Sequence, residues 1–400
     1  MTATVVDEGA AGGHRTVLLL ALTQAGSMTG VTMVTLSTAL ASAYLAIDPR
    51  FVTLPLAVQF LATMCSTFPA SMLMARIGRR LGFSLGQMIG IAGATLSVVA
   101  LMEGSFVLFL SGAVLLGMHN AFWGYYRFAA AEAAEPAFKS RAISLVMAGG
   151  VLSALAGPEL AKITRDLLAP ISFAGCYVTI AILCTLNIVG LQFARLPPAP
   201  PRTAVPVKGR SIVELLRQPK FASAVLAAMV AYGVMILVMA ATPISMVDCG
   251  LTFDNAAFVI QWHALAMFVP SFFTGSLIRR IGTIPVIMIG LVLNTVCIAA
   301  HLSGTDLANF WLGLVALGLG WNFMYVGATT LLTESYRSED RSVAQATNDT
   351  LVFAGITVAT FASGALQNTL GWQAVNMAIA VPLLIAFVAV IASRRAPAAA

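Results

Sequence analysis

The stretch Ser71–Phe83, SMLMARIGRRLGF, marks an abrupt change from apolar to basic sequence. About twenty uncharged residues precede it, and then Arg76, Arg79 and Arg80 occur within five positions. A similar stretch, Gly275–Pro285, GSLIRRIGTIP, follows about 204 residues later. Arginines that directly follow an apolar segment of spanning length are typical of a cytoplasmic loop. The recurrence therefore predicts an internally duplicated membrane protein.

Composition agrees with this interpretation. Of 400 residues, 59% are apolar and 10% are charged, whereas soluble domains carry about 25% charged residues. The five cysteines lie in apolar runs without metal or redox spacing, so we expect no metal site and no cofactor. The fold class predicted is an all-α membrane protein with 12 transmembrane helices in two six-helix pseudo-repeats. The expected spans are 17–43, 52–75, 84–102, 106–130, 142–162, 170–193, 221–246, 256–278, 283–302, 308–332, 343–366 and 372–393.

The segments outside the spans define the expected organisation. We expect an irregular cytoplasmic N-terminal tail at 1–16 and a Pro-rich, basic cytoplasmic linker at 194–220 that contains a short amphipathic helix at Ser211–Arg217. Six-helix bundles at 17–193 and 221–393 flank the linker, and a cytoplasmic tail follows at 394–400. With both termini in the cytoplasm, 18 of the 22 Lys and Arg residues fall on the inner side. The net charge of +6 thus reflects topology in a bacterial-type inner membrane, and no nucleic-acid partner is implied.

The repeated loop resembles a motif of the major facilitator superfamily, Gly-x-Leu-Ala-Asp-Arg-x-Gly-Arg-Lys. The first copy reads Ser71-x-Leu73-Met74-Ala75-Arg76-x-Gly78-Arg79-Arg80, and the second reads Gly275-x-Leu277-Ile278-Arg279-Arg280-x-Gly282. The resemblance covers essentially the whole chain. It implies a gating role for Arg76, Gly78, Arg79, Arg80, Arg280 and Gly282, with a simple positive-inside anchor as the alternative. The family's Asp is replaced by Ala75 and Arg279, so the cytoplasmic clasp must use other groups or be weaker.

Span five carries small residues that are similar to the family's antiporter motif. Gly149, Gly157 and Pro158 form the expected helix-packing motif, and ordinary tight packing is the alternative interpretation. Glu132 and Glu334 end spans four and ten at matching places, where we expect them to face the basic loops.

The resemblance implies that spans one, four, seven and ten line the solute cavity. His119, Trp123 and Tyr126 fall on one face of an expected continuous helix. His119 and Asp349 are the candidates for ion coupling, because imidazole titrates near neutrality and a carboxylate inside a span is costly. Helix packing for His119 and gate pairing for Asp349 are the alternatives. The expected substrate-binding residues are Gln24, His119, Asn120, Trp123, Tyr126, Tyr232, Trp321, Asn322 and Tyr325.

These features predict a secondary active transporter that moves a small flat aromatic or amphipathic organic solute by alternating access. Riboflavin-like import is one hypothesis, and proton-coupled export of drugs or metabolites is the alternative. A transporter-like sensor or scaffold is an alternative of another class. We do not expect an enzyme, because the sequence shows no paired carboxylates at one depth, no His-x-x-x-His and no serine elbow. Without a nucleotide-binding loop, a proton is the expected coupling ion. Membrane lipids are the other expected partner, and the family default is a monomer.

Overall fold

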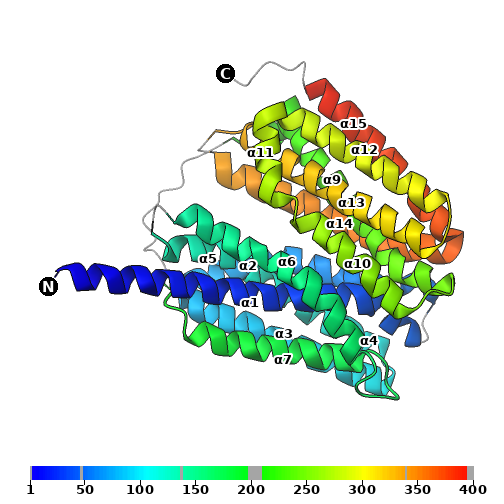
Figure 1. Ribbon diagram of the computed structural model, residues 1–400, viewed down its shortest axis with the longest axis horizontal. Helices are drawn as coiled ribbons and strands as arrows, with labels where there is room; N and C mark the ends of the chain where they lie inside the picture. The colour runs from blue at the N-terminus through cyan, green and yellow to red at the C-terminus, as the bar shows by residue number, and fades with distance from the viewer. Residues whose placement is uncertain (1, 46–47, 136–137, 197–209, 338–339, 394–400) are drawn as a thin grey trace. The chain divides into compact units, whose positions relative to one another are not determined.

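The computed structural model describes residues 2–45, 48–135, 138–196, 210–337 and 340–393, and these ranges contain helices and turns but no strand (Figure 1). The chain forms two compact units. Unit 1 comprises Met1–Ile47 and Val58–Arg202, and unit 2 comprises Asp48–Ala57 and Thr203–Ala400.

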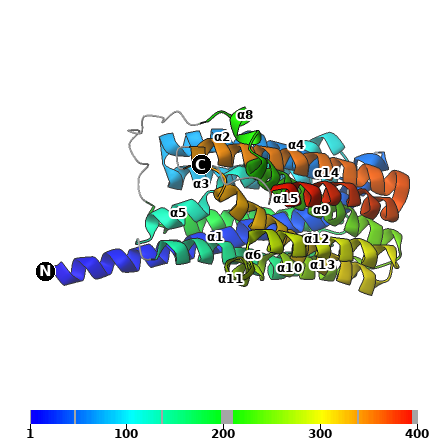
Figure 2. The ribbon, with the colours of Figure 1, turned by 90° about the horizontal axis from the view of Figure 1, so that it is seen from above.

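Unit 1 is built from seven helices within the described ranges, and the first residues of one of them, α2, belong to unit 2. Their bounds are α1 (Thr2–Tyr44), α2 (Leu54–Ile77), α3 (Arg79–Glu103), α4 (Phe106–Trp123), α5 (Tyr126–Ala133), α6 (Lys139–Thr164) and α7 (Ala174–Gln192). The sequence predicted an irregular tail at 1–16, and this prediction is wrong, because helix α1 already begins at Thr2. Its first turns extend past the other helices of unit 1 (Figures 1 and 2).

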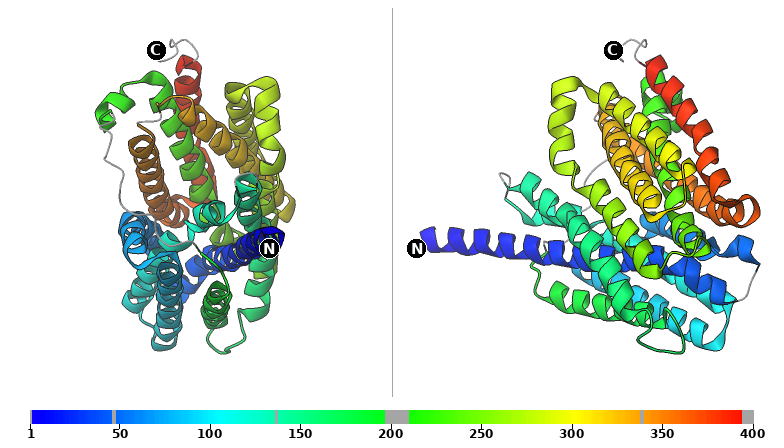
Figure 3. Two further views of the ribbon diagram at one scale, coloured as in Figure 1. Left: turned by 90° about the vertical axis from the view of Figure 1, so that its left-hand side faces the viewer. Right: turned by 45° about the vertical axis from the view of Figure 1, so that its right-hand side comes forward.

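Unit 2 contains the remaining helices (Figure 3). They are η1 (Pro49–Phe51), α8 (Ile212–Leu216), α9 (Pro219–Asp248), α10 (Phe253–Phe268), α11 (Ser271–Ile281), α12 (Thr283–Leu302), α13 (Leu307–Thr333), α14 (Arg341–Ala378) and α15 (Ala380–Ser393). The Thr53 hydroxyl, between η1 and α2, donates to the Thr360 carbonyl of α14 at 2.8 Å and accepts from the Gly364 amide at 3.0 Å. The segment after η1 is thereby held to α14.

Ten helical segments in the described chain are long and apolar enough to cross a membrane, or eleven if the bent pair α10–α11 counts as one span. The last segment, Val343–Ser393, has 51 residues, about twice the length that one crossing needs. Its backbone leaves the helical region at Gly371, where φ is 80° and ψ is 180°. The twelve spans expected from the sequence are consistent with this arrangement.

Two expected spans contain a turn or a bend. Span four, expected at 106–130, is one apolar span at Phe106–Ala130, and within it α4 ends at Trp123 and α5 begins at Tyr126 after a turn at Gly124 and Tyr125. Span eight, expected at 256–278, is divided into α10 and α11, which meet at an angle of 44° (Figure 1). Pro270 lies in this second break, and it supplies no backbone N–H to continue the helix.

Glycine contacts bring helices together inside each unit. A Cβ added at Gly93 on α3 or at Gly112 on α4 would lie 3.0 Å from the other residue's carbonyl oxygen. Unit 2 repeats this contact between Gly290 on α12 and Gly320 on α13, with corresponding distances of 2.8 and 2.9 Å. Membrane helices gain little from hydrophobic segregation, so they associate through such close backbone approach.

The span-five glycines make the same kind of contact. A Cβ at Gly149 on α6 would lie 2.9 Å from the Ala25 amide of α1, and one at Gly157 would lie 2.7 Å from Thr32 Cβ. Pro158 lies inside α6, which continues to Thr164. These positions therefore pack α6 against α1.

Candidate functional site

Three aromatic side chains meet on two helices of unit 2. Tyr232 comes from α9, and Trp321 and Tyr325 come from α13, one turn apart. The Trp321 and Tyr325 rings are nearly parallel, with centroids 5.2 Å apart and an interplanar angle of 12°. Tyr232 meets both edge-on, at 5.1 Å from Trp321 and 4.9 Å from Tyr325. We call Tyr232, Trp321 and Tyr325 the aromatic cluster.

The cluster combines ring surface with a hydrogen-bond donor that is not used. Trp321 is 6% exposed, and no described residue accepts a hydrogen bond from its Nε1. Buried indole N–H groups usually find an acceptor. The arrangement suits a flat ligand that stacks on aromatic rings and presents a carbonyl oxygen or ring nitrogen to Trp321.

A fourth aromatic ring beside this cluster was not predicted from the sequence. Phe268, the last residue of α10, packs against Trp321 at 6.3 Å and 70°. Its signal was Pro270, because a proline two residues later marks a helix break that can redirect the preceding side chain.

Asn322 follows Trp321 in the sequence, but its side chain bonds to residues of α10 and α11. It is fully buried, and its Nδ2 donates to the Met267 carbonyl and to Ser271 Oγ, each at 2.7 Å. Its Oδ1 accepts from the Thr274 hydroxyl at 2.7 Å. Both amide hydrogens are thus occupied by protein atoms, and substrate contact by Asn322 remains an untested prediction.

The substrate candidates of unit 1 lie on both sides of the turn at Gly124 and Tyr125, and each has its own surroundings. His119 is buried, and its Nδ1 lies 3.0 Å from the Gly86 carbonyl of α3. Trp123 donates to Asn120 Oδ1 at 3.0 Å within α4.

Tyr126 is fully buried, and its hydroxyl accepts from Gln87 at 2.8 Å. Gln24 is buried on α1, with no hydrogen-bond partner for Oε1 among the described residues.

A buried polar network in unit 1 was also missed. Ser27 Oγ accepts from Gln87 Nε2 at 3.0 Å and from Asn187 Nδ2 at 3.2 Å, which links α1, α3 and α7. Polar amides inside apolar spans were the available signal. The adjoining cavity, lined by Ser27, Gln59 and His119 among others, has a volume of about 10 Å³. It is large enough for about one water molecule and too small for an organic solute.

The second coupling candidate, Asp349, lies near the start of α14 and is exposed. Asn348 Nδ2 donates to its Oδ1 at 3.1 Å. Its exposure contrasts with the burial of His119.

The basic loops contact acidic and carbonyl groups within their own units. Arg79 pairs with Glu132 at 2.5 Å, as expected for that acidic residue, and Arg80 donates to the carbonyls of Leu191 and Gln192 at the end of α7. In unit 2, Glu334 accepts from Thr283, which lies in the second copy of the loop, at 3.3 Å and pairs with Lys220 at the end of the basic linker at 3.1 Å. Gly78 and Gly282 precede α3 and α12 with φ of 84° and 92°.

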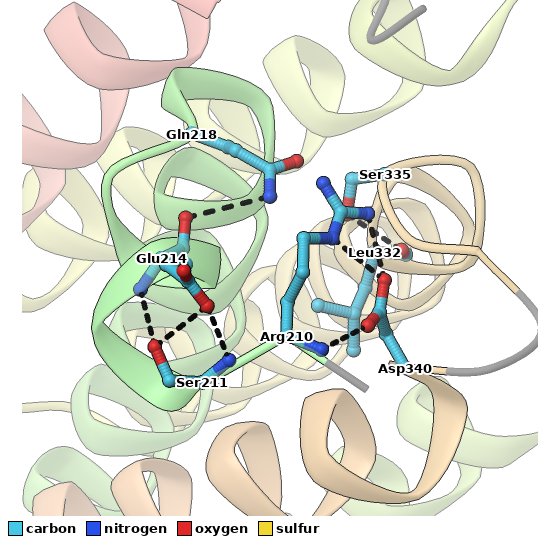
Figure 4. Close-up of polar contacts among 7 residues, drawn as sticks. All are labelled: Arg210, Ser211, Glu214, Gln218, Leu332, Ser335 and Asp340. Carbon is cyan, nitrogen blue, oxygen red and sulfur yellow. Dashed lines mark hydrogen bonds and ion pairs between the residues drawn. The ribbon is translucent and has the colours of Figure 1, made fainter. Parts of the chain in front are cut away.

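The end of the linker is attached to unit 2 by an ion pair that the sequence did not reveal (Figure 4). Arg210 donates its backbone N–H to Asp340 Oδ1 at 2.6 Å and its Nε to Oδ2 at 2.8 Å. The Asp340 side chain is 2% exposed. These hydrogen bonds, led by those of the guanidinium group, lower the pKa of the Asp340 carboxyl.

The short helix expected in the linker begins directly after Arg210 and Ser211. Helix α8 spans Ile212–Leu216 and begins with a capping box, in which Ser211 Oγ accepts from the Glu214 amide and Glu214 accepts from the Ser211 amide. The short helix predicted at Ser211–Arg217 is thus confirmed to within a residue at each end.

Comparison with known proteins identifies the class. The profile of the Major Facilitator Superfamily matches residues 18–261 and 224–400. The chain therefore belongs to this family of membrane transporters, as its repeated loop motif indicated.

Two curated relatives align over most of the chain. The riboflavin transporter RfnT of Brucella anthropi is 37% identical over 368 residues, which cover 92% of each chain. The MFS-type transporter YdeG of Bacillus subtilis is 31% identical over 359 residues, covering 84% of this chain and 82% of its own.

Solved structures show the same fold. A bacterial homolog of the human lysosomal transporter Spinster, in an inward-facing and occupied conformation, has a TM-score of 0.71 and 17% identity over 95% of this chain and 96% of that chain. The human organic anion transporter MFSD10 has a TM-score of 0.66 and 13% identity over 94% of this chain and 99% of that chain.

Proposed function

We propose that this transporter imports riboflavin, or a closely similar flat heteroaromatic solute, by alternating access. The aromatic cluster carries the proposal. The rings of Trp321 and Tyr325 stack, Tyr232 meets both edge-on, and the buried Trp321 N–H has no acceptor among the described residues.

Riboflavin has the chemistry that this arrangement recognises. Its isoalloxazine is a flat, fused aromatic ring system with carbonyl oxygens and ring nitrogens at its edge. Stacking would use the ring faces, while a carbonyl oxygen would accept the hydrogen bond of Trp321. The 37% identity to a riboflavin transporter over 92% of both chains supports the same substrate class.

The proposal places the chain in a bacterial inner membrane as a monomer with both termini in the cytoplasm. The distribution of basic residues supports this orientation. We assign proton coupling to Asp349, since its exposed carboxylate lies on a membrane-spanning helix, whereas His119 Nδ1 is engaged by a backbone carbonyl.

The test is riboflavin uptake by cells that cannot synthesise riboflavin, with the chain expressed or absent. We expect uptake only with the chain, and loss of uptake in Asp349→Asn and after addition of a protonophore. Glucose uptake by a phosphotransferase system, measured in parallel, controls for general loss of energy. Chain-dependent expulsion of dyes or antibiotics, without riboflavin uptake, would replace this proposal with that of an exporter.

A further inference from the structure

The break between α10 and α11 lacks the hydrogen bonds of a continuous helix. Val269 still donates to the Leu265 carbonyl, but Pro270 has no N–H to give to the next carbonyl. Among the described residues, no backbone N–H donates to the Met267 carbonyl across the break. Phe272 donates to the Val269 carbonyl at 3.3 Å and Phe273 to the Pro270 carbonyl at 2.9 Å, and regular bonding resumes when Thr274 also donates to the Pro270 carbonyl, at 2.8 Å.

A proline alone does not produce such a break in this chain. Pro69 lies inside α2, Pro158 inside α6 and Pro243 inside α9, and each of these helices continues past its proline. A further group must therefore favour the bend at Pro270.

Asn322 on α13 contacts this break. Its Nδ2 donates to the Met267 carbonyl, before the break, and to Ser271 Oγ, after the break. Thr274, one turn into α11, shares its hydroxyl proton between Asn322 Oδ1 at 2.7 Å and the Pro270 carbonyl at 2.8 Å. One fully buried side chain thus binds both sides of the bend.

The bend also contacts the aromatic cluster. Phe268 ends α10 and packs against Trp321, the residue before Asn322. Phe268 lies directly before the bend and contacts Trp321, so a change in the angle between α10 and α11 would move Phe268 relative to Trp321. The angle would also redirect the end of α11, which carries Arg279 and Arg280.

We propose that Asn322 is a positioning residue that holds the α10–α11 bend and, through Phe268, sets the geometry of the aromatic site without contacting the solute. The consequence for solute recognition rests on the proposed function, whereas the control of the bend does not. The amide group supplies a hydrogen-bond donor to the Met267 carbonyl at the bend, as neighbouring helices do for interrupted membrane helices.

The bend can be measured directly in the full chain reconstituted in vesicles. Spin labels at Asp254→Cys and Arg279→Cys, in a background without other cysteines, mark the start of α10 and the end of α11. A straight helix would separate these positions by about 38 Å. We expect a shorter and narrow distance distribution in the parent, and a longer or broader one in Asn322→Ala.

Two further variants make the result interpretable. Thr274→Val removes a partner of Asn322 at a position distinct from the aromatic rings, so it should change the distance distribution in the same direction. Asn294→Ala is the matched control, because this buried amide on α12 donates to Gly290 and Met324 and not to the α10–α11 break. It should leave the distances of the parent unchanged.

Riboflavin binding to the same variants separates positioning from direct contact. We expect Asn322→Ala and Thr274→Val to weaken binding to a similar extent, about threefold or more, with Asn294→Ala unaffected. Loss of binding in Asn322→Ala with unchanged distances and normal binding in Thr274→Val would make Asn322 a ligand of the solute and overturn the proposal. Unchanged distances in both folded variants would also overturn it. If the parent binds no riboflavin, the proposed function fails, and the distances still decide whether Asn322 holds the bend.

Discussion

Trp321 combines two properties that substitution can separate. Its ring stacks on Tyr325 and meets Tyr232 edge-on, while its N–H has no acceptor among the described residues. An unsatisfied buried donor costs about 1–3 kcal/mol. Binding of a solute that accepts this hydrogen bond would remove that cost.

We expect Trp321→Phe to weaken riboflavin binding while preserving the stacked ring. A net hydrogen bond is worth about 0.5–1.5 kcal/mol, so the dissociation constant should rise about two- to tenfold. Quenching of flavin fluorescence by the purified protein measures this change. Trp311→Phe is the control, since Trp311 lies ten residues earlier on the same helix and contacts Trp262 instead. Equal effects of the two substitutions would contradict a specific role for the Trp321 N–H.

At the residue scale, the sequence could place some candidates together and not others. Trp321 and Tyr325 are one turn apart on a helix that remains continuous, so their shared face could be predicted. For Tyr126 the sequence could not show the turn at Gly124 and Tyr125 that separates it from Trp123. Tyr126 packs instead against Phe83 at 4.6 Å.

At the element scale, neighbouring helices decide where a span breaks. Pro69 and Pro158 remain inside helices, whereas Pro270 lies at a bend that Asn322 binds from α13. At Gly371 the break has a different cause, because its positive φ is a conformation that suits glycine. These differences depend on side chains far away in the sequence.

The end of the linker is held in place by one ion pair, between Arg210 and Asp340. Arg210 precedes α8, and Asp340 precedes α14. Their ion pair joins segments that are 130 residues apart in the chain. Because Asp340 is almost fully buried, the carboxylate depends on Arg210 for compensation of its charge.

This ion pair predicts a pH-dependent contribution to stability. The folded pKa of Asp340 lies below its unfolded value, so the contribution is present above about pH 4 and is lost as the pH falls through the folded pKa. We expect Asp340→Asn to lower the unfolding temperature in detergent by about 2–4 °C at pH 7. The difference from the parent should shrink on acidification below about pH 4.

Glu103→Gln provides the comparison for this prediction, because Glu103 is an exposed carboxylate at the end of α3. It should leave the unfolding temperature unchanged at pH 7. A gap between the parent and Asp340→Asn that stays constant across the pH range would show that ionisation of Asp340 does not stabilise the fold.

At the scale of the whole molecule, each unit gathers basic residues at one end. In unit 1, Arg79 contacts Glu132 at the end of α5, and Arg80 contacts the end of α7. In unit 2, Lys220 contacts Glu334 at the end of α13. Lys and Arg concentrate on the cytoplasmic side of membrane proteins, which agrees with the proposed orientation.

Cysteine labelling tests this orientation. Cys249 is exposed after α9 and is expected outside the cell, whereas Arg217 is exposed after α8 and is expected in the cytoplasm. In a chain without other cysteines, a membrane-impermeant maleimide should label Cys249 in intact cells. It should label Arg217→Cys only after permeabilisation, and the reverse pattern would invert the proposed topology.

The sequence by itself determined that this is a duplicated helical membrane protein with basic loops and a central linker. It could do so because spanning segments must be long and apolar, and because their backbone groups must bond within the helix. Only the tertiary structure decided where α4, α10 and α14 are interrupted and which partner Asn322, His119 and Asp340 take. Helices that are apolar on all sides carry no stripe that marks an inward face, so these contacts depend on the residues that neighbouring helices present.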